Sequence, residues 1–128
     1  MMNSKEVSQL FDLPIDTIRY YERVGVIPPI TRDKNGYRIY AKRDLNWIFL
    51  AKSLRKAGLS IESLIEFATL AQSKENVRAA QKQILQDQLT EINVKLEEMV
   101  RARDLLEYKI ETFDDHVAKI NAGELSDD

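Results

Sequence analysis

A regular heptad of apolar residues runs through the second half of this 128-residue chain, and it limits the possible folds most strongly. Between Lys74 and Gly123 there is neither glycine nor proline, and large apolar residues recur at alternating steps of four and three. They are Leu85, Leu89, Ile92, Leu96, Met99, Leu106, Ile110, Phe113, Val117 and Ile120. A repeat of 3.5 residues is typical of a coiled-coil seam, in which a helix buries one narrow apolar stripe against a partner.

The length of this seam implies a partner outside the chain's own small domain. A continuous helix from Leu85 to Ile120 would span about 54 Å at 1.5 Å per residue. The simplest partner is a second copy, which gives a two-fold dimer. Arg103 occupies one seam position, where it either sets the register of the pair or extends its guanidinium into solvent.

Composition excludes several classes of protein. The chain has no cysteine and one histidine, His116, so we expect neither a metal nor a cofactor and interpret His116 as a solvated surface residue. No Ser/His/Asp set or phosphate loop is visible, so we do not expect an enzyme. Without a signal peptide or an apolar run of membrane-spanning length, the expected location is the cytoplasm, with no membrane partner.

The net charge of −2 conceals an asymmetry between the two halves of the chain. Residues 1–58 contain 11 lysines and arginines against 6 acidic residues, a net charge of +5. Residues 59–128 contain 8 against 15, a net charge of −7. A basic first half suggests a polyanionic partner, although ordinary surface charge that happens to segregate would give the same totals.

The N-terminal residues predict a helix-turn-helix over about 4–23. Asn3 and Glu6 have the spacing of a capping box at the start of a first short helix. The Asp12-Leu13-Pro14 segment ends that helix, and Pro14 suits the first turn of the next one. Gly25 is a favourable C-terminal cap for this second helix, residues 15–24.

The second helix carries a polar stripe opposite its apolar face. Asp16, Arg19, Tyr20 and Arg23 recur at i, i+3, i+4 and i+7, so they share one side of the helix. The planar guanidinium of arginine binds two acceptors at once, on phosphates or on guanine edges. The stripe therefore predicts a helix that enters a DNA groove.

A basic hairpin is expected over residues 30–40. Asn35-Gly36 favours a type I′ turn, in which both central residues have positive φ. Arg32, Lys34 and Arg38 make the hairpin basic, as expected for a wing that lies along a phosphate backbone. A plain surface hairpin would have the same turn signal.

Two further helices should complete the head. The first, from Asp44 to Lys56, is apolar around most of its circumference, and we assign Trp47 and Phe49 to the core. Gly58 ends it, and Ser60 caps a fourth helix.

These motifs together resemble the MerR family of bacterial transcription regulators. The resemblance runs from about Ser4 to Leu70 and rests on several motifs in the family's order. They are DTIRYYER at 16–23 followed by Gly25, Pro28-Pro29, NGYRIY at 35–40, Asp44-Leu45 and LRKAGLS at 54–60.

The resemblance implies a mainly α fold, with a winged helix-turn-helix head and a long antiparallel coiled-coil dimerisation helix. A homodimer would bind a pseudo-palindromic site in double-stranded promoter DNA, and would act on RNA polymerase indirectly by bending and untwisting that DNA. Tyr21 and Glu22 match the motif but are expected to be partly structural. The implied DNA-contacting residues are Thr17, Arg19, Tyr20 and Arg23 on the helix and Asn35, Tyr37, Arg38 and Tyr40 in the wing.

The chain departs from the family pattern in three ways. Asp12 replaces the usual glycine between the first two helices, and aspartate tolerates unusual backbone angles. Pro14 replaces the usual Ser or Thr cap, which weakens the cap. The cysteines of metal- and thiol-sensing members are absent, so we do not expect sensing by thiol chemistry.

We expect a DNA-binding domain over 1–72, a coiled-coil helix over 73–121 and a disordered tail over 122–128. The alternative function is a coiled-coil interaction adaptor whose basic head has no specific DNA site. The sequence names no small-molecule effector. A small pocket between Phe67 and Leu70 and the partner's Tyr108 and the partner's Phe113 is one possibility, and a plain dimer joint is the other.

Overall fold

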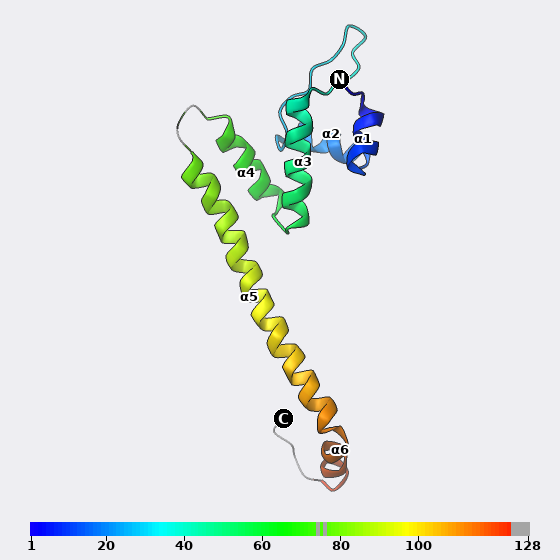
Figure 1. Ribbon diagram of the computed structural model, residues 1–128, viewed down its shortest axis with the longest axis vertical. Helices are drawn as coiled ribbons and strands as arrows, with labels where there is room; N and C mark the ends of the chain where they lie inside the picture. Colours follow the sequence, from blue (N-terminus) through cyan, green and yellow to red (C-terminus); the bar gives the residue numbers. More distant parts are fainter. Residues whose placement is uncertain (74, 76, 124–128) are drawn as a thin grey trace. The chain divides into compact units, whose positions relative to one another are not determined.

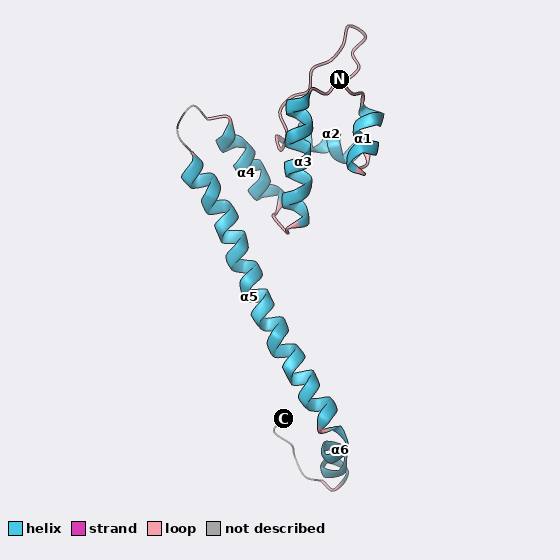
Figure 2. Cartoon of the chain, in the orientation of Figure 1, coloured by secondary structure: helices cyan, strands magenta, loops and turns pink. Residues whose placement is uncertain are grey.

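The structure, a computed structural model, describes residues 1–73, 75 and 77–123. Within this part the fold is helical, without a named strand, which confirms the mainly α prediction (Figures 1 and 2). The chain divides into two compact units, Met1–Gln88 and Leu89–Asp128. Its helices are α1 (Ser4–Phe11), α2 (Ile15–Val24), α3 (Lys42–Lys56), α4 (Ile61–Ala71), α5 (Arg78–Glu111) and α6 (Phe113–Asn121).

The predicted helix-turn-helix is present as α1 and α2. The capping box is confirmed, since Asn3 Oδ1 accepts from the Glu6 N–H at 2.9 Å and Glu6 Oε1 accepts from the Asn3 N–H at 3.0 Å. Asp12 adopts a left-handed conformation with φ of +52°, which lets the chain turn sharply without glycine. Pro14 is the N-cap of α2 and provides no side-chain cap, while Gly25 caps its C-terminus at φ +88°.

The core of the first unit lies between α1, α2, α3, α4 and the loop after α2. Ile84, in the second turn of α5, packs against the same core. Burying each of the Val, Ile and Leu side chains contributes roughly 1.5–3 kcal/mol. The buried residues are Val7, Ile18, Tyr21, Val26, Ile27, Ile30, Tyr40, Ile48, Ala51, Leu59 and Leu64.

The wing does not contain the predicted type I′ turn. Among the residues of the turn only Gly36 has positive φ, at +85°, whereas Asn35 does not. The Gly36 N–H donates to the Asp33 carbonyl at 3.0 Å, and the Asp33 N–H donates to the Tyr37 carbonyl at 2.8 Å. This is a three-residue loop ending in a left-handed glycine. The Asp33 carboxylate selects it by accepting from the Asn35 and Tyr37 N–H groups at 2.8 and 3.0 Å.

Two isolated antiparallel bridges involve the wing, one within it and one at its end. Arg32 pairs with Arg38 across the hairpin, and Met2 pairs with Tyr40. The second bridge ties the N-terminus of the chain to the end of the wing, next to the first turn of α1.

Helix α3 differs from the prediction at its start and at one residue that was assigned to the core. It begins at Lys42, two residues before the predicted start, because the Asp44 carboxylate accepts from the Ala41 N–H at 2.9 Å. Trp47 is partly buried against the core, as expected. Phe49 is 63% exposed, so its assignment to the core was wrong. The broad apolar surface of α3 exceeds what α1 and α4 cover.

The long helix ends earlier than the seam predicted. Helix α5 stops at Glu111, and a separate helix, α6, starts after Thr112, so a continuous helix to Ile120 is wrong (Figure 1). The Thr112 hydroxyl donates to the Tyr108 carbonyl at 2.8 Å, beside the Thr112 N–H at 3.0 Å, and such a side-chain bond to the carbonyl four residues earlier often bends a helix. No described helix is both long and apolar enough to cross a membrane.

The joint between α5 and α6 encloses the histidine that was expected in solvent. His116 is only 8% exposed. Its Nδ1 lies 3.2 Å from the Thr112 hydroxyl, and its ring lies 5.9 Å from that of Tyr108. The solvated interpretation of His116 was therefore wrong, because α6 places this residue against the end of α5.

Candidate nucleic-acid interface

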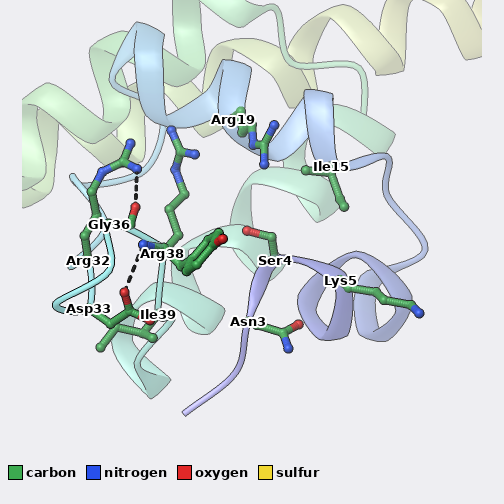
Figure 3. Close-up of a pocket in the computed structure, with 11 residues that line it drawn as sticks. Asn3, Ser4, Lys5, Ile15, Arg19, Arg32, Asp33, Gly36, Arg38 and Ile39 are labelled. Carbon is green, nitrogen blue, oxygen red and sulfur yellow. Dashed lines mark hydrogen bonds between the residues drawn. The ribbon is translucent and has the colours of Figure 1, made fainter.

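An open groove of about 580 Å³ separates the wing from the helix-turn-helix (Figure 3). Helix α2 contributes its N-terminal half, α1 contributes its capped first turn, and the wing forms the opposite side. The lining residues are Asn3, Ser4, Lys5, Ile15, Arg19, Arg32, Asp33, Gly36, Tyr37, Arg38 and Ile39.

The groove is basic and its wing side is internally braced. Its cations are Lys5, Arg19, Arg32 and Arg38, against one carboxylate, Asp33. Arg32 donates to the Gly36 carbonyl at 2.9 Å, across the turn of the wing (Figure 3). The Asp33 carboxylate is itself engaged by two backbone N–H groups. The groove therefore carries positive charge on α1, on α2 and on the wing.

Glu22 connects helix α2 to the wing. Its Oε1 accepts from Arg38 Nε at 2.8 Å, and its Oε2 accepts from the Ile30 N–H at 2.9 Å. Burial raises the pKa of Glu22, but the Ile30 N–H, Arg38 and Arg32 lower it by more, so the pKa lies below its ordinary value. One carboxylate thus holds both the start of the wing and the arginine that faces the groove.

Glu22→Gln should destabilise the head by about 1 kcal/mol at neutral pH, because the ion pair with Arg38 is replaced by a hydrogen bond from the guanidinium to an uncharged amide oxygen. Because the pKa of Glu22 is lower in the folded state, the carboxylate stabilises the protein when the pH is above the unfolded-state pKa. This contribution disappears as the pH falls through the folded-state pKa. The difference in unfolding free energy between wild type and variant should therefore be constant above about pH 5 and shrink below it. Urea titrations between pH 3 and 8 measure this, and a difference independent of pH would contradict the assignment.

The predicted contact residues fall into three groups. Arg19, Tyr37 and Arg38 line the groove together. Thr17, Tyr20, Arg23 and Asn35 do not line it, although Arg23 and Asn35 are exposed. The Arg23 guanidinium lies 5.3 Å from the centre of the Tyr20 ring, so these two neighbours on the stripe form a cation–π pair.

Tyr40 differs from the other predicted contact residues. Its side chain is 1% exposed and belongs to the hydrophobic core. Its backbone instead pairs with Met2, whose N–H donates to the Tyr40 carbonyl at 3.1 Å. The structure therefore places Tyr40 among the residues that support the wing, and its side chain is not available at the surface.

Ser4 and Lys5 were not among the predicted site residues. They reach the groove because the bridge between Met2 and Tyr40 brings the first turn of α1 next to the wing. That pairing spans 38 positions of the sequence, and no local pattern indicates it. The available signal was Lys5, a basic residue in the first turn of α1.

The described residues contain no group of three or more His, Cys, Asp or Glu side chains that could hold a metal ion. The groove instead offers guanidinium, ammonium and hydroxyl groups, which suit phosphate oxygens and base edges.

The fold and the basic groove define a winged helix-turn-helix DNA-binding protein. Residues 2–69 match the MerR HTH family regulatory protein domain. The chain is 38% identical over 109 residues to the HTH-type transcriptional regulator HmrR of Rhizobium leguminosarum bv. viciae, covering 85% of this chain and 84% of HmrR. It therefore belongs to the MerR family of DNA-binding transcription regulators, and it is not an enzyme.

Other relatives agree with this family. The chain is 47% identical over 87 residues to the HTH-type transcriptional regulator AdhR of Bacillus subtilis, a match that spans 68% of this chain and 62% of AdhR. A crystal structure described as a MerR family transcriptional regulator from Listeria monocytogenes superposes with a TM-score of 0.76 at 38% identity, covering 96% of this chain and 93% of that one. HiNmlR, a MerR family regulator lacking the sensor domain and crystallised with promoter DNA, has the same fold, with a TM-score of 0.70 at 24% identity and coverage of 91% and 92%.

Proposed function

We propose that two copies of this chain bind one pseudo-palindromic promoter site and regulate transcription by bending and untwisting the DNA. The observation that carries the proposal is the basic groove, in which Arg19 of α2 and Arg38 of the wing line one concave surface. A recognition helix in a major groove flanked by a wing on the backbone uses this pair of elements. RNA polymerase would respond to the altered DNA shape, in the cytoplasm.

The pairing of two copies is supported by the unpartnered seam of the second unit. Leu96, Met99, Leu106 and Ile110 all face solvent in the single chain. A surface of this kind on a soluble helix marks an interface. We propose that residues 73–121 form the dimerisation segment, in antiparallel arrangement with a second copy, and that residues 1–72 form the DNA-binding domain.

Deformation of the DNA follows from the two-headed arrangement. Two heads fixed to one paired helix grip successive turns of a duplex only if the DNA adopts the spacing of the heads. Bending a site of 20–30 base pairs by 40–90° costs on the order of 1–6 kcal/mol, which phosphate contacts offset. HiNmlR, crystallised with promoter DNA, shares this fold.

Binding to a selected duplex should weaken steeply with salt. A dimer that makes roughly 6–10 phosphate contacts should lose about 10³–10⁵ in affinity between 50 and 200 mM salt. Fluorescence anisotropy with a duplex selected from a random library, alongside a scrambled duplex, measures both affinity and specificity. Equal affinity for the two duplexes at physiological salt would contradict the proposal and favour an adaptor whose basic head binds an acidic protein.

A further inference from the structure

The first three turns of α5 are bonded to α3 and α4 by residues that take no part in the groove. Gln81, Ile84 and Gln88 recur at i, i+3 and i+7, which places them on one face of α5. Ile84 packs against the hydrophobic core. Gln81 Nε2 donates to the Phe67 carbonyl at 3.2 Å, and Gln88 Nε2 donates to the Ala57 carbonyl at 3.0 Å. We call Gln81, Ile84 and Gln88 the α5 clip.

The Gln88 amide lies next to the glycine that follows α3. Ala57 is the C-terminal cap of α3, and the last carbonyls of a helix have no partner within it. Gly58 follows with φ of +93°, and a Cβ atom added there would lie 2.9 Å from Gln88 Nε2. A side chain at position 58 would be strained at this φ and would displace the end of the Gln88 side chain. The end of α3 and the third turn of α5 are joined here by the bond from Gln88 to Ala57.

We propose that Gln81 and Gln88 are positioning residues that set the distance between the two DNA-binding heads of a dimer. The inference rests on the proposed function. Helix α5 is continuous from Arg78 to Glu111, so a bond at its first three turns acts on the same helix that carries the seam. Two heads discriminate the spacing of two half-sites only if neither swings freely on its helix. The clip supplies that restraint with two directional bonds and one apolar contact.

The clip predicts a specific defect in a Gln81→Met, Gln88→Met protein. Methionine keeps the length of the side chain and its apolar contacts but cannot donate to a carbonyl. The wild type should bind a duplex selected from a random library better than the same duplex with its half-sites moved by one or two base pairs. In the variant the ratio of these affinities should fall by up to about 25-fold, because two neutral hydrogen bonds are lost and each corresponds to a factor of about five.

Separate readouts distinguish positioning from simple stability. Loss of stability alone would weaken binding to duplexes of every half-site spacing equally. A loosened joint between the head and α5 would instead change the ratio of the affinities for the two spacings. Hydrogen exchange of the amides over residues 78–88 should quicken in the double variant. When Gln88→Lys replaces Gln88→Met, the lysine keeps a donor of similar reach. It should restore most of the ratio between the affinities for the two half-site spacings. Gln83→Met is the matched control, since Gln83 bonds Asp87 within α5 at 2.7 Å.

Two results would overturn this inference, and they differ. A wild type that prefers one spacing, together with a double variant that keeps the same ratio, shows that the clip does not position the heads. A wild type that selects no duplex at all refutes the proposed function, and the positioning role falls with it.

Discussion

Replacing Arg19 and Arg38 by alanine in one chain should lower the affinity for the selected duplex by about 1,000-fold at physiological salt. A dimer loses four guanidiniums, and each contact with a base edge or phosphate contributes roughly 1–3 kcal/mol. Both side chains line the same groove, Arg19 from the recognition helix and Arg38 from the wing. Anisotropy titrations at several salt concentrations should also show a reduced salt slope, because fewer counterions are released.

The matched control removes the same charge elsewhere. Lys95→Ala, Arg101→Ala takes two cations from exposed positions on α5, so it changes the net charge equally without touching the groove. This control should bind within about twofold of wild type, because neither side chain lines the groove and salt screens exposed charges. Near-normal binding by the Arg19→Ala, Arg38→Ala protein would refute the groove as the DNA interface.

The parts of the fold that the sequence predicted correctly depend on residues close together in the chain. The capping box of α1 depends on Asn3 and Glu6, three positions apart, and the end of α2 depends on one glycine, Gly25. The polar stripe of α2 follows from the helical period alone. Each of these features is decided within one or two turns, where local hydrogen bonding and backbone preference dominate.

The incorrect predictions concern residues whose burial depends on segments far away in the sequence. Phe49 faces outward because the neighbouring helices do not reach it, and Tyr40 is buried because the end of the wing, which pairs with Met2, joins the hydrophobic core. His116 is buried because α5 ends at Glu111 and α6 begins at Phe113, whereas the heptad pattern continues through Thr112 without interruption. Apolar periodicity predicts that a face will be covered, but it does not say by which segment.

The same distinction applies within the candidate site. The family resemblance implied Arg19, Tyr37 and Arg38 as contact residues, and these three residues line one groove. The pairing of Glu22 with Arg38 spans 16 positions and gives no local signal. The residues that hold an interface together are therefore harder to predict than the residues that line it.

Leu96→Glu should prevent dimerisation and, with it, specific DNA binding. In a two-fold dimer the substitution occurs in both copies. It therefore places two carboxylates in the seam and removes two buried leucines, each of which contributes about 1.5–3 kcal/mol. We expect the dissociation constant of the dimer to rise about 100-fold or more. Sedimentation equilibrium between 1 and 100 μM, followed by anisotropy with the selected duplex, measures both effects.

Val94→Glu provides a close comparison for this substitution. Val94 is 49% exposed in the single chain and Leu96 is 53% exposed, so exposure alone does not separate them. Only Leu96 lies on the heptad seam, whereas Val94 falls on the opposite side of α5. If the two variants stay equally dimeric, the seam is not the interface and the two-headed mode of binding fails. If Leu96→Glu is monomeric and retains full affinity for the selected duplex, one head suffices, and the spacing of the heads has no part in recognition.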